Sequence, residues 1–112
     1  LTMGWEPYEK RQVDGDAASA PFMPVMATDG RGNLLLAWAT GTAPAYKLVY
    51  HRYSAGAWGA TTAVPGGAMT NEAFEGVQAL PLAMSTNGLA ALAWTNYDTV
   101  KYVSTVRLAS FY

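Results

Sequence analysis

Six residues have side chains suited to holding a polar, ring-shaped ligand. They are Trp5, Tyr50, Arg52, Tyr53, Trp58 and Glu72. Aromatic faces pack against the apolar faces of sugar rings, while Arg and Glu side chains fix hydroxyl groups through hydrogen bonds. We therefore predict that these six residues form a ligand-binding site, with carbohydrate as the ligand class. The alternative for each aromatic side chain is packing in the core.

Residues for acid–base or metal chemistry are sparse. Glu72 and Glu75 are three positions apart, which is compatible with a carboxylate pair, but a solvated loop is the favoured interpretation. The segment 29–33 offers oxygen ligands for calcium, yet a tight turn explains the same residues. The chain has no cysteine and a single histidine, His51, which excludes cysteine nucleophiles, zinc–thiolate sites and multi-histidine sites. We expect no catalytic residue, no metal and no cofactor.

The composition excludes two further classes of partner. The 112 residues are 51% hydrophobic and 13% charged, with a net charge of −1, so the basic patch of a nucleic-acid-binding protein is missing. No apolar run approaches the roughly 18 residues that a membrane-spanning helix needs. Low charge with abundant Ala, Gly, Thr, Trp and Tyr is typical of secreted bacterial β proteins. From composition alone, we expect an extracellular or periplasmic location.

The sequence contains an internal repeat with a period of 56 residues. The pairs that share this spacing are Gly32 and Gly88, Trp38 and Trp94, Tyr46 and Tyr102, His51 and Arg107, and Ser54 and Ser110. Pro24 and Pro81 lie 57 positions apart, which we attribute to one additional turn residue in the first copy. Since Trp38 and Trp94 each end an apolar segment at a fixed repeat position, we expect both to pack in the core.

Each copy has the pattern of β structure. Short apolar segments separated by Gly-, Asp- and Pro-containing turns predict strands rather than helices. The predicted strands of the first copy are 23–28, 33–40, 46–54 and 58–64, the last ended by Pro65-Gly66-Gly67; those of the second are 77–85, 89–97 and 101–111. Residues 69–75 could form one helical turn at most.

Repeats of this length with four strands each predict an all-β fold of β-propeller-type blades, about two per chain. Residues 1–112 then form a single two-repeat unit. Repeat 1 spans about 22–65, and repeat 2 spans about 77–112 and is completed by a strand at 4–13. Two blades cannot close a ring, so we expect either a ring of several chains, in which 101–111 pairs with 4–13 of the next chain, or a piece of a longer propeller. A β-sandwich is the alternative.

The same residues carry a family resemblance. The segment 24–38 and the segment 48–53, followed by Gly56-Ala57-Trp58, resemble repeats of bacterial sialidase-like and lectin-like β-propeller proteins. Some such lectins have two blades per chain and build their ring from three chains. The spacing from Asp29 to Trp38 departs from the sialidase Asp-box.

The resemblance implies a secreted, noncatalytic module that binds carbohydrate between blades. The alternatives are a fragment of a larger sialidase-like propeller, whether an enzyme or a surface protein, and a structural or assembly unit engineered from one. The partners we expect are further copies of the chain or the rest of a longer propeller, together with a glycan.

Overall fold

A computed structural model describes residues 22–42, 45–70, 72–74 and 80–112. Every regular element in these ranges is a β-strand, which confirms the all-β prediction. The strands are β1 (Phe22–Thr28), β2 (Leu34–Thr42), β3 (Ala45–Ser54), β4 (Ala57–Trp58), β5 (Thr62–Thr70), β6 (Glu72–Phe74), β7 (Leu82–Met84), β8 (Ala90–Asp98) and β9 (Val103–Phe111).

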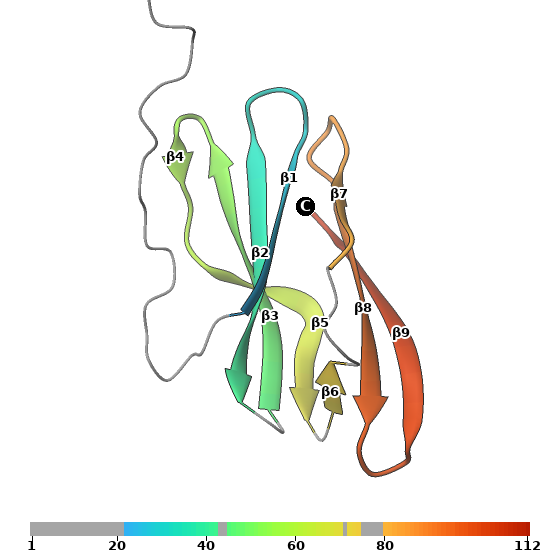
Figure 1. Ribbon diagram of the computed structural model, residues 1–112. Helices are drawn as coiled ribbons and strands as arrows, with labels where there is room; N and C mark the ends of the chain where they lie inside the picture. Colours follow the sequence, from blue (N-terminus) through green and yellow to red (C-terminus); the bar gives the residue numbers. More distant parts are fainter. Residues whose placement is uncertain (1–21, 43–44, 71, 75–79) are drawn as a thin grey trace, which may run out of the picture.

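The strands form two antiparallel sheets, one from residues 22–70 and one from residues 72–111 (Figure 1). In the first sheet, β1, β2 and β3 are neighbours, and β4 and β5 both pair with β3. In the second sheet, β8 pairs with β6, β7 and β9. The chain passes from the first sheet to the second between β5 and β6. The second sheet therefore resembles the first in its order but lacks a described fourth strand beside β9.

Five predicted strands are confirmed, at 23–28, 33–40, 46–54, 89–97 and 101–111. Of the predicted strand 77–85, only 82–84 is strand and 77–79 lie outside the described residues, as does the whole predicted strand 4–13. The main difference concerns the fourth strand of the first repeat. The predicted strand 58–64 is wrong: β4 covers only two residues, and β5 continues through Pro65-Gly66-Gly67 to Thr70. The ladder between β3 and β5 is irregular where Lys47 pairs with Ala68 and Val49 pairs with Ala63. This bulge holds Pro65, which has no N–H group to donate to a ladder. The proline thus bends the strand without ending it.

Residues 69–75, for which the sequence allowed one helical turn at most, are strand at the positions that the structure describes. β5 extends to Thr70, opposite Ala45, and β6 pairs Glu72 with Asp98. Pairing with strands distant in sequence supplies the backbone hydrogen bonds here, and it overrides the local tendency of the segment.

The hydrogen-bond register tests the repeat alignment. Ala27 pairs with Leu35, and Ala83 pairs with Ala91, so the first hairpins of the two sheets match at a spacing of 56. At this spacing the two prolines are not equivalent, and the 57-residue alignment of Pro24 with Pro81 is not supported.

The next hairpin breaks the alignment by two residues. Trp38 pairs with Val49, whereas Trp94 pairs with Arg107. The cause is the connection, which has two residues between β2 and β3 but four between β8 and β9. The predicted equivalence of His51 with Arg107 is therefore wrong. Tyr102 likewise differs from Tyr46, because Tyr102 lies in the hairpin turn with a positive φ of 56°.

The hydrophobic core lies between the two sheets. From β2 it takes the alternate residues Leu35, Ala37 and Ala39, and from β8 it takes Ala90, Leu92 and Trp94. The repeat equivalent of Leu35 is Ala91, which is not a core residue, whereas its neighbours Ala90 and Leu92 are. Because alternate residues of a strand point to opposite faces, the two sheets contribute opposite faces to the core. Other core members are Leu48, Val64, Leu80, Ala109 and Phe111.

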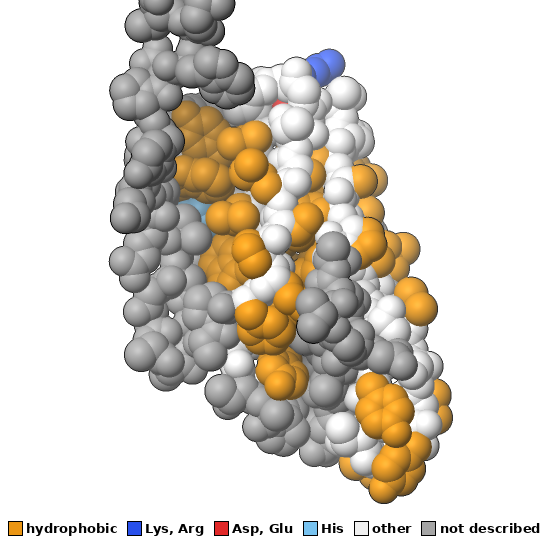
Figure 2. Space-filling view, viewed as in Figure 1, with side chains coloured by type: hydrophobic (Ala, Val, Ile, Leu, Met, Phe, Trp, Pro, Cys, Tyr) orange, Lys and Arg blue, Asp and Glu red, His pale blue; other side chains and the backbone are white. Residues whose placement is uncertain are grey.

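β9 presents an apolar surface at the edge of the second sheet. Val106 and Leu108 are 75% and 71% exposed, and Val103 is also exposed. Figure 2 shows hydrophobic side chains along the edge where β9 lies. Among the described strands, β9 pairs only with β8, so one side of its backbone has no described strand beside it.

Candidate functional site

The structure divides the predicted binding residues between two faces of β3. Arg52 and Tyr50 lie on the face toward the second sheet, where the Tyr50 ring stacks on Phe111 with 4.6 Å between centroids. Tyr53 lies on the opposite face, directly across the ladder from Trp58, and their rings contact edge-to-face at 5.3 Å. The four predicted residues whose side chains are described therefore do not lie on one face of the sheet.

The side chains of the remaining two predicted residues, Trp5 and Glu72, are not described by the structure. Trp5 lies outside the described residues. Glu72 is the first residue of β6, and only its backbone, which pairs with Asp98, is described. The prediction of both as ligand contacts stays a prediction.

His51 packs beside tryptophans on the outer face of the first sheet. Its ring centroid lies 5.2 Å from that of Trp58 and 6.3 Å from that of Trp38. Its Nδ1 atom is 3.3 Å from the hydroxyl of Thr61. Trp38 is 3% exposed and Trp94 is 2% exposed, so the predicted burial of both is confirmed.

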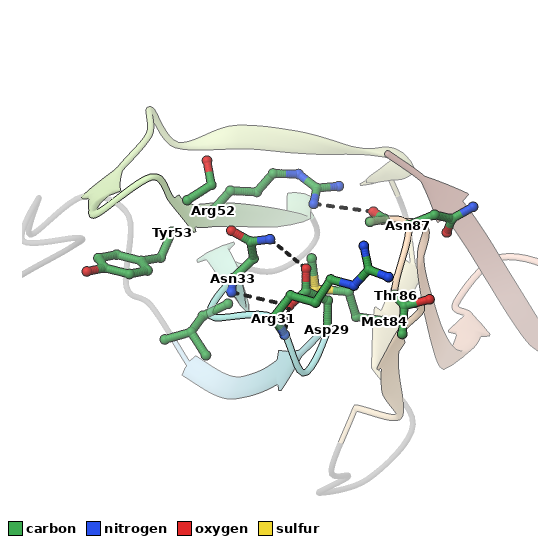
Figure 3. A pocket seen from close by; sticks show the side chains of 11 residues that line it. Asp29, Arg31, Asn33, Arg52, Tyr53, Met84, Thr86 and Asn87 are labelled. Atoms are coloured by element: carbon green, nitrogen blue, oxygen red, sulfur yellow. Dashed lines mark hydrogen bonds between the residues drawn. The ribbon is translucent and has the colours of Figure 1, made fainter.

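A cavity of about 390 Å³, lined by both polar and apolar groups, lies where the two sheets meet (Figure 3). Its walls come from three places in the chain: the β1–β2 turn, the end of β3 and the β7–β8 turn. The polar lining residues are Asp29, Arg31, Asn33, Arg52, Tyr53, Ser54, Thr86 and Asn87. The two turns occupy equivalent positions of the repeat, so the cavity lies between corresponding ends of the two sheets.

Asp29 organises the first of these turns. Its carboxylate accepts hydrogen bonds from the backbone N–H of Arg31 at 2.6 Å and of Asn33 at 3.2 Å, and from the Asn33 side chain at 2.6 Å. The hydrogen bond from the Asn33 side chain, followed by that from the Arg31 backbone, lowers the pKa of Asp29 below its ordinary value. This arrangement is the tight turn predicted for these residues.

The second turn is built from neutral side chains. The Ser85 hydroxyl and the Asn87 side-chain oxygen are in contact, and both accept from the backbone N–H of Leu89. The backbone N–H of Gly88 also donates to the carbonyl of Ser85 at 3.0 Å. Thr86, which lines the cavity, is exposed.

Arg52 connects the two sheets across the cavity. Its Nη1 atom donates to the carbonyl of Gly88 at 3.4 Å, as Figure 3 shows. Its guanidinium carbon lies 5.5 Å from the ring centroid of Tyr50 and 5.9 Å from that of Phe111. The aromatic pair therefore holds the guanidinium group in position.

Tyr53 contributes to the cavity wall, but its ring extends away from the guanidinium groups (Figure 3). Of the predicted residues whose side chains the structure describes, Arg52 and Tyr53 line the cavity, and Tyr50 and Trp58 do not. Sequence reasoning missed Arg31, Asn33, Thr86 and Asn87. One feature of the sequence could have predicted them: the two turns hold the same position in the repeat, so both are expected at the same end of the molecule.

Within the described ranges, no group of three His, Cys, Asp or Glu side chains is placed to bind a metal ion. The described part of the chain also has no helix with the length and apolar character needed to cross a membrane.

Comparison of the chain with protein-family models, with curated proteins and with solved structures finds no match.

Proposed function

We propose that this chain is a noncatalytic binding module of β-propeller type that recognises carbohydrate in the cavity between its two sheets. The cavity carries the proposal, because its volume suits a small ligand and its lining supplies side-chain amide, hydroxyl and guanidinium groups. Sugar hydroxyl groups accept hydrogen bonds from guanidinium and amide N–H groups and donate them to amide and hydroxyl oxygens. The described residues bring no carboxylate pair or activated nucleophile to the cavity.

The packing of the sheets supports the propeller part of the proposal. Rotation about a ring axis carries one blade onto the next, so the front of each blade meets the back of its neighbour. A two-fold sandwich would instead bring equivalent faces together. In this chain, β2 and β8 occupy the same position in their sheets but turn opposite faces toward the shared core. The core residues are Leu35, Ala37 and Ala39 from β2 and Ala90, Leu92 and Trp94 from β8.

A glycan array tests the proposal. We expect the full-length chain to bind a subset of immobilised glycans, and Thr86→Trp to abolish that binding by filling the cavity from an exposed turn position. Val100→Trp is the matched control, because Val100 is 65% exposed in the hairpin at the other end of the second sheet. If no glycan binds, or if both variants bind like the unmodified chain, the proposal is wrong.

Assembly of several copies into a ring is a second candidate function, and the exposed surface of β9 favours it. Val106 and Leu108 lie on the outer face of the second sheet, and apolar side chains this exposed on an edge strand promote association. Rings of four to eight blades would need roughly two to four copies of a two-blade chain. Light scattering after size-exclusion chromatography should then give a mass of two to four times the 11.9 kDa of one chain. A folded monomer would contradict ring assembly.

A further inference from the structure

Asn87 and Gly88 lie in the β7–β8 turn, on the wall of the cavity. Asn87 is exposed, and Figure 3 shows its side chain extending away from Arg52. Among the asparagines of the sequence, Asn87 alone is followed by glycine. Because glycine has no Cβ, the backbone nitrogen of Gly88 can approach the side-chain amide of Asn87 closely.

The turn holds the Asn87 side chain against the backbone that follows it. Its side-chain oxygen accepts a hydrogen bond from the N–H of Leu89 at 3.4 Å, and the Ser85 hydroxyl donates to the same oxygen. An asparagine oxygen that reaches the N–H two residues on keeps its carbonyl carbon beside the intervening nitrogen, which here belongs to Gly88. The amide carbon and this nitrogen are therefore neighbours before any reaction begins.

The two donors on the amide oxygen also favour attack on the amide carbon. Such an attack moves negative charge onto the oxygen, and positioned O–H and N–H groups stabilise that charge as it develops. The Ser85 hydroxyl and the Leu89 N–H are placed to do so. The Gly88 N–H donates to the carbonyl of Ser85 at 3.0 Å, so this hydrogen bond must open before the nitrogen attacks.

We infer that Asn87 is a site of spontaneous modification, where the chain converts its own asparagine into aspartate and isoaspartate, with Ser85 as the activating donor. Hydroxide removes the N–H proton of Gly88, and the nitrogen forms a bond to the side-chain carbonyl carbon of Asn87. The carbon–nitrogen bond of the side-chain amide breaks, and the amide group takes a proton from water and leaves as ammonia. Water then opens the resulting succinimide ring at either of its carbonyl groups, which gives aspartate or isoaspartate.

Either product changes the wall of the cavity. A carboxylate replaces the neutral amide of Asn87, and isoaspartate also adds a carbon atom to the backbone before Gly88. The Gly88 carbonyl accepts from the Nη1 atom of Arg52 at 3.4 Å, so its displacement would loosen this contact between the two sheets. The reaction needs no ligand, so its occurrence is independent of whether the cavity binds a glycan.

Incubation of the full-length chain in mildly alkaline buffer at physiological temperature tests the inference. Peptide mapping by mass spectrometry follows the gain of about 1 Da at each asparagine, and electron-based fragmentation distinguishes aspartate from isoaspartate. We expect Asn87 to react at least about tenfold faster than Asn33 and Asn96.

Asn33 and Asn96 serve as internal controls. The Asn33 side chain donates to Asp29 at 2.6 Å, and Asn96 is 1% exposed within β8. Each is followed by a residue with a bulky side chain, which hinders the attack. Equal rates at the three asparagines would overturn the inference. So would an unreactive Asn87 in the folded chain over a period in which the urea-unfolded chain reacts.

Two glycine variants locate the nucleophile. Gly88→Ala adds a Cβ beside the attacking nitrogen and should slow the reaction at Asn87 by about tenfold. Gly32→Ala is the matched control, because both glycines have a φ of 89° in corresponding turns, and a Cβ at either would meet open space. Equal rates at Asn87 in the two variants would contradict attack by the Gly88 nitrogen.

Ser85→Ala tests the activating contact. Loss of one ordinary hydrogen bond to the developing charge should slow the reaction at Asn87 by about fivefold. Circular dichroism checks that the variant is folded, and the glycine variants remain informative if it is not. An unchanged or faster rate in folded Ser85→Ala would overturn the activating role of Ser85.

Discussion

Trp38 and Trp94 occupy the same position of the 56-residue repeat, yet only Trp94 faces the core between the two sheets. Trp94 packs between the two sheets, whereas Trp38 lies on the other face of the first sheet, 6.3 Å from the His51 ring. When the front of one sheet packs on the back of the other, a repeat position that faces the interface in one sheet faces away from it in the other.

Loss of the Trp94 side chain should strongly destabilise the fold. Trp94 is 2% exposed within the core, so Trp94→Ala removes a large apolar side chain and leaves a cavity, at a cost of about 3–5 kcal/mol in the free energy of unfolding. Leu108→Ala, at a 71% exposed position, should change it by less than about 0.5 kcal/mol. Urea unfolding measures both. Equal costs for the two variants would contradict the placement of Trp94.

Gly41 should tolerate substitution much less well than Gly30. Both have positive φ, 101° and 77°, but a Cβ at Gly41 would lie 2.4 Å from the carbonyl oxygen of Ala45, while one at Gly30 would meet open space. We expect Gly30→Ala to cost about 1 kcal/mol from backbone strain alone, and Gly41→Ala to cost more than about 2 kcal/mol. Thermal unfolding of the two variants compares them, and an inverted order would be inconsistent with the β2–β3 hairpin described here.

Stability should decrease in acid partly through Asp29. Hydrogen bonds from Asn33 and from the Arg31 backbone hold the pKa of this carboxyl below its unfolded value. The carboxylate therefore stabilises the fold at pH values above the unfolded pKa, and this contribution is lost as the pH falls through the folded pKa. The unfolding free energy of the unmodified chain should fall more steeply below about pH 4 than that of Asp29→Asn. Parallel pH profiles would show that Asp29 contributes nothing.

The exposed surface of β9 should contribute to association and not to folding. Val106→Lys and Leu108→Lys introduce charge at exposed positions, so the free energy of unfolding of the monomer should change by less than about 1 kcal/mol. Any oligomer that uses this face should dissociate, because a buried lysine without a partner is costly. Light scattering shows the change in mass. An oligomer that survives both substitutions must use another surface.

Much of the strand pattern was predictable because local signals decide it. Glycine and aspartate at 29–32 define the first turn, and the apolar segment around Trp38 defines β2. The path after Trp58 was not predictable, because Pro65 is accommodated by a bulge against β3 that depends on long-range pairing.

The candidate site was predictable only in part, for a related reason. Tyr50, Arg52 and Tyr53 are near neighbours in sequence, but strand alternation sends the Tyr53 ring to the opposite face. The polar residues that join Arg52 at the cavity come from turns of both repeats. Their proximity follows from the packing of the sheets, which composition and spacing do not specify.

Amide chemical-shift mapping tests ligand binding in the cavity most directly. During titration with the glycan that binds best on the array, resonances of Asn33, Arg52 and Gly88 should shift together and saturate with one dissociation constant. Amides of the β8–β9 hairpin, such as Val100, should remain unchanged. Shifts confined to that hairpin, or no saturable shift at the cavity, would contradict binding between the two sheets.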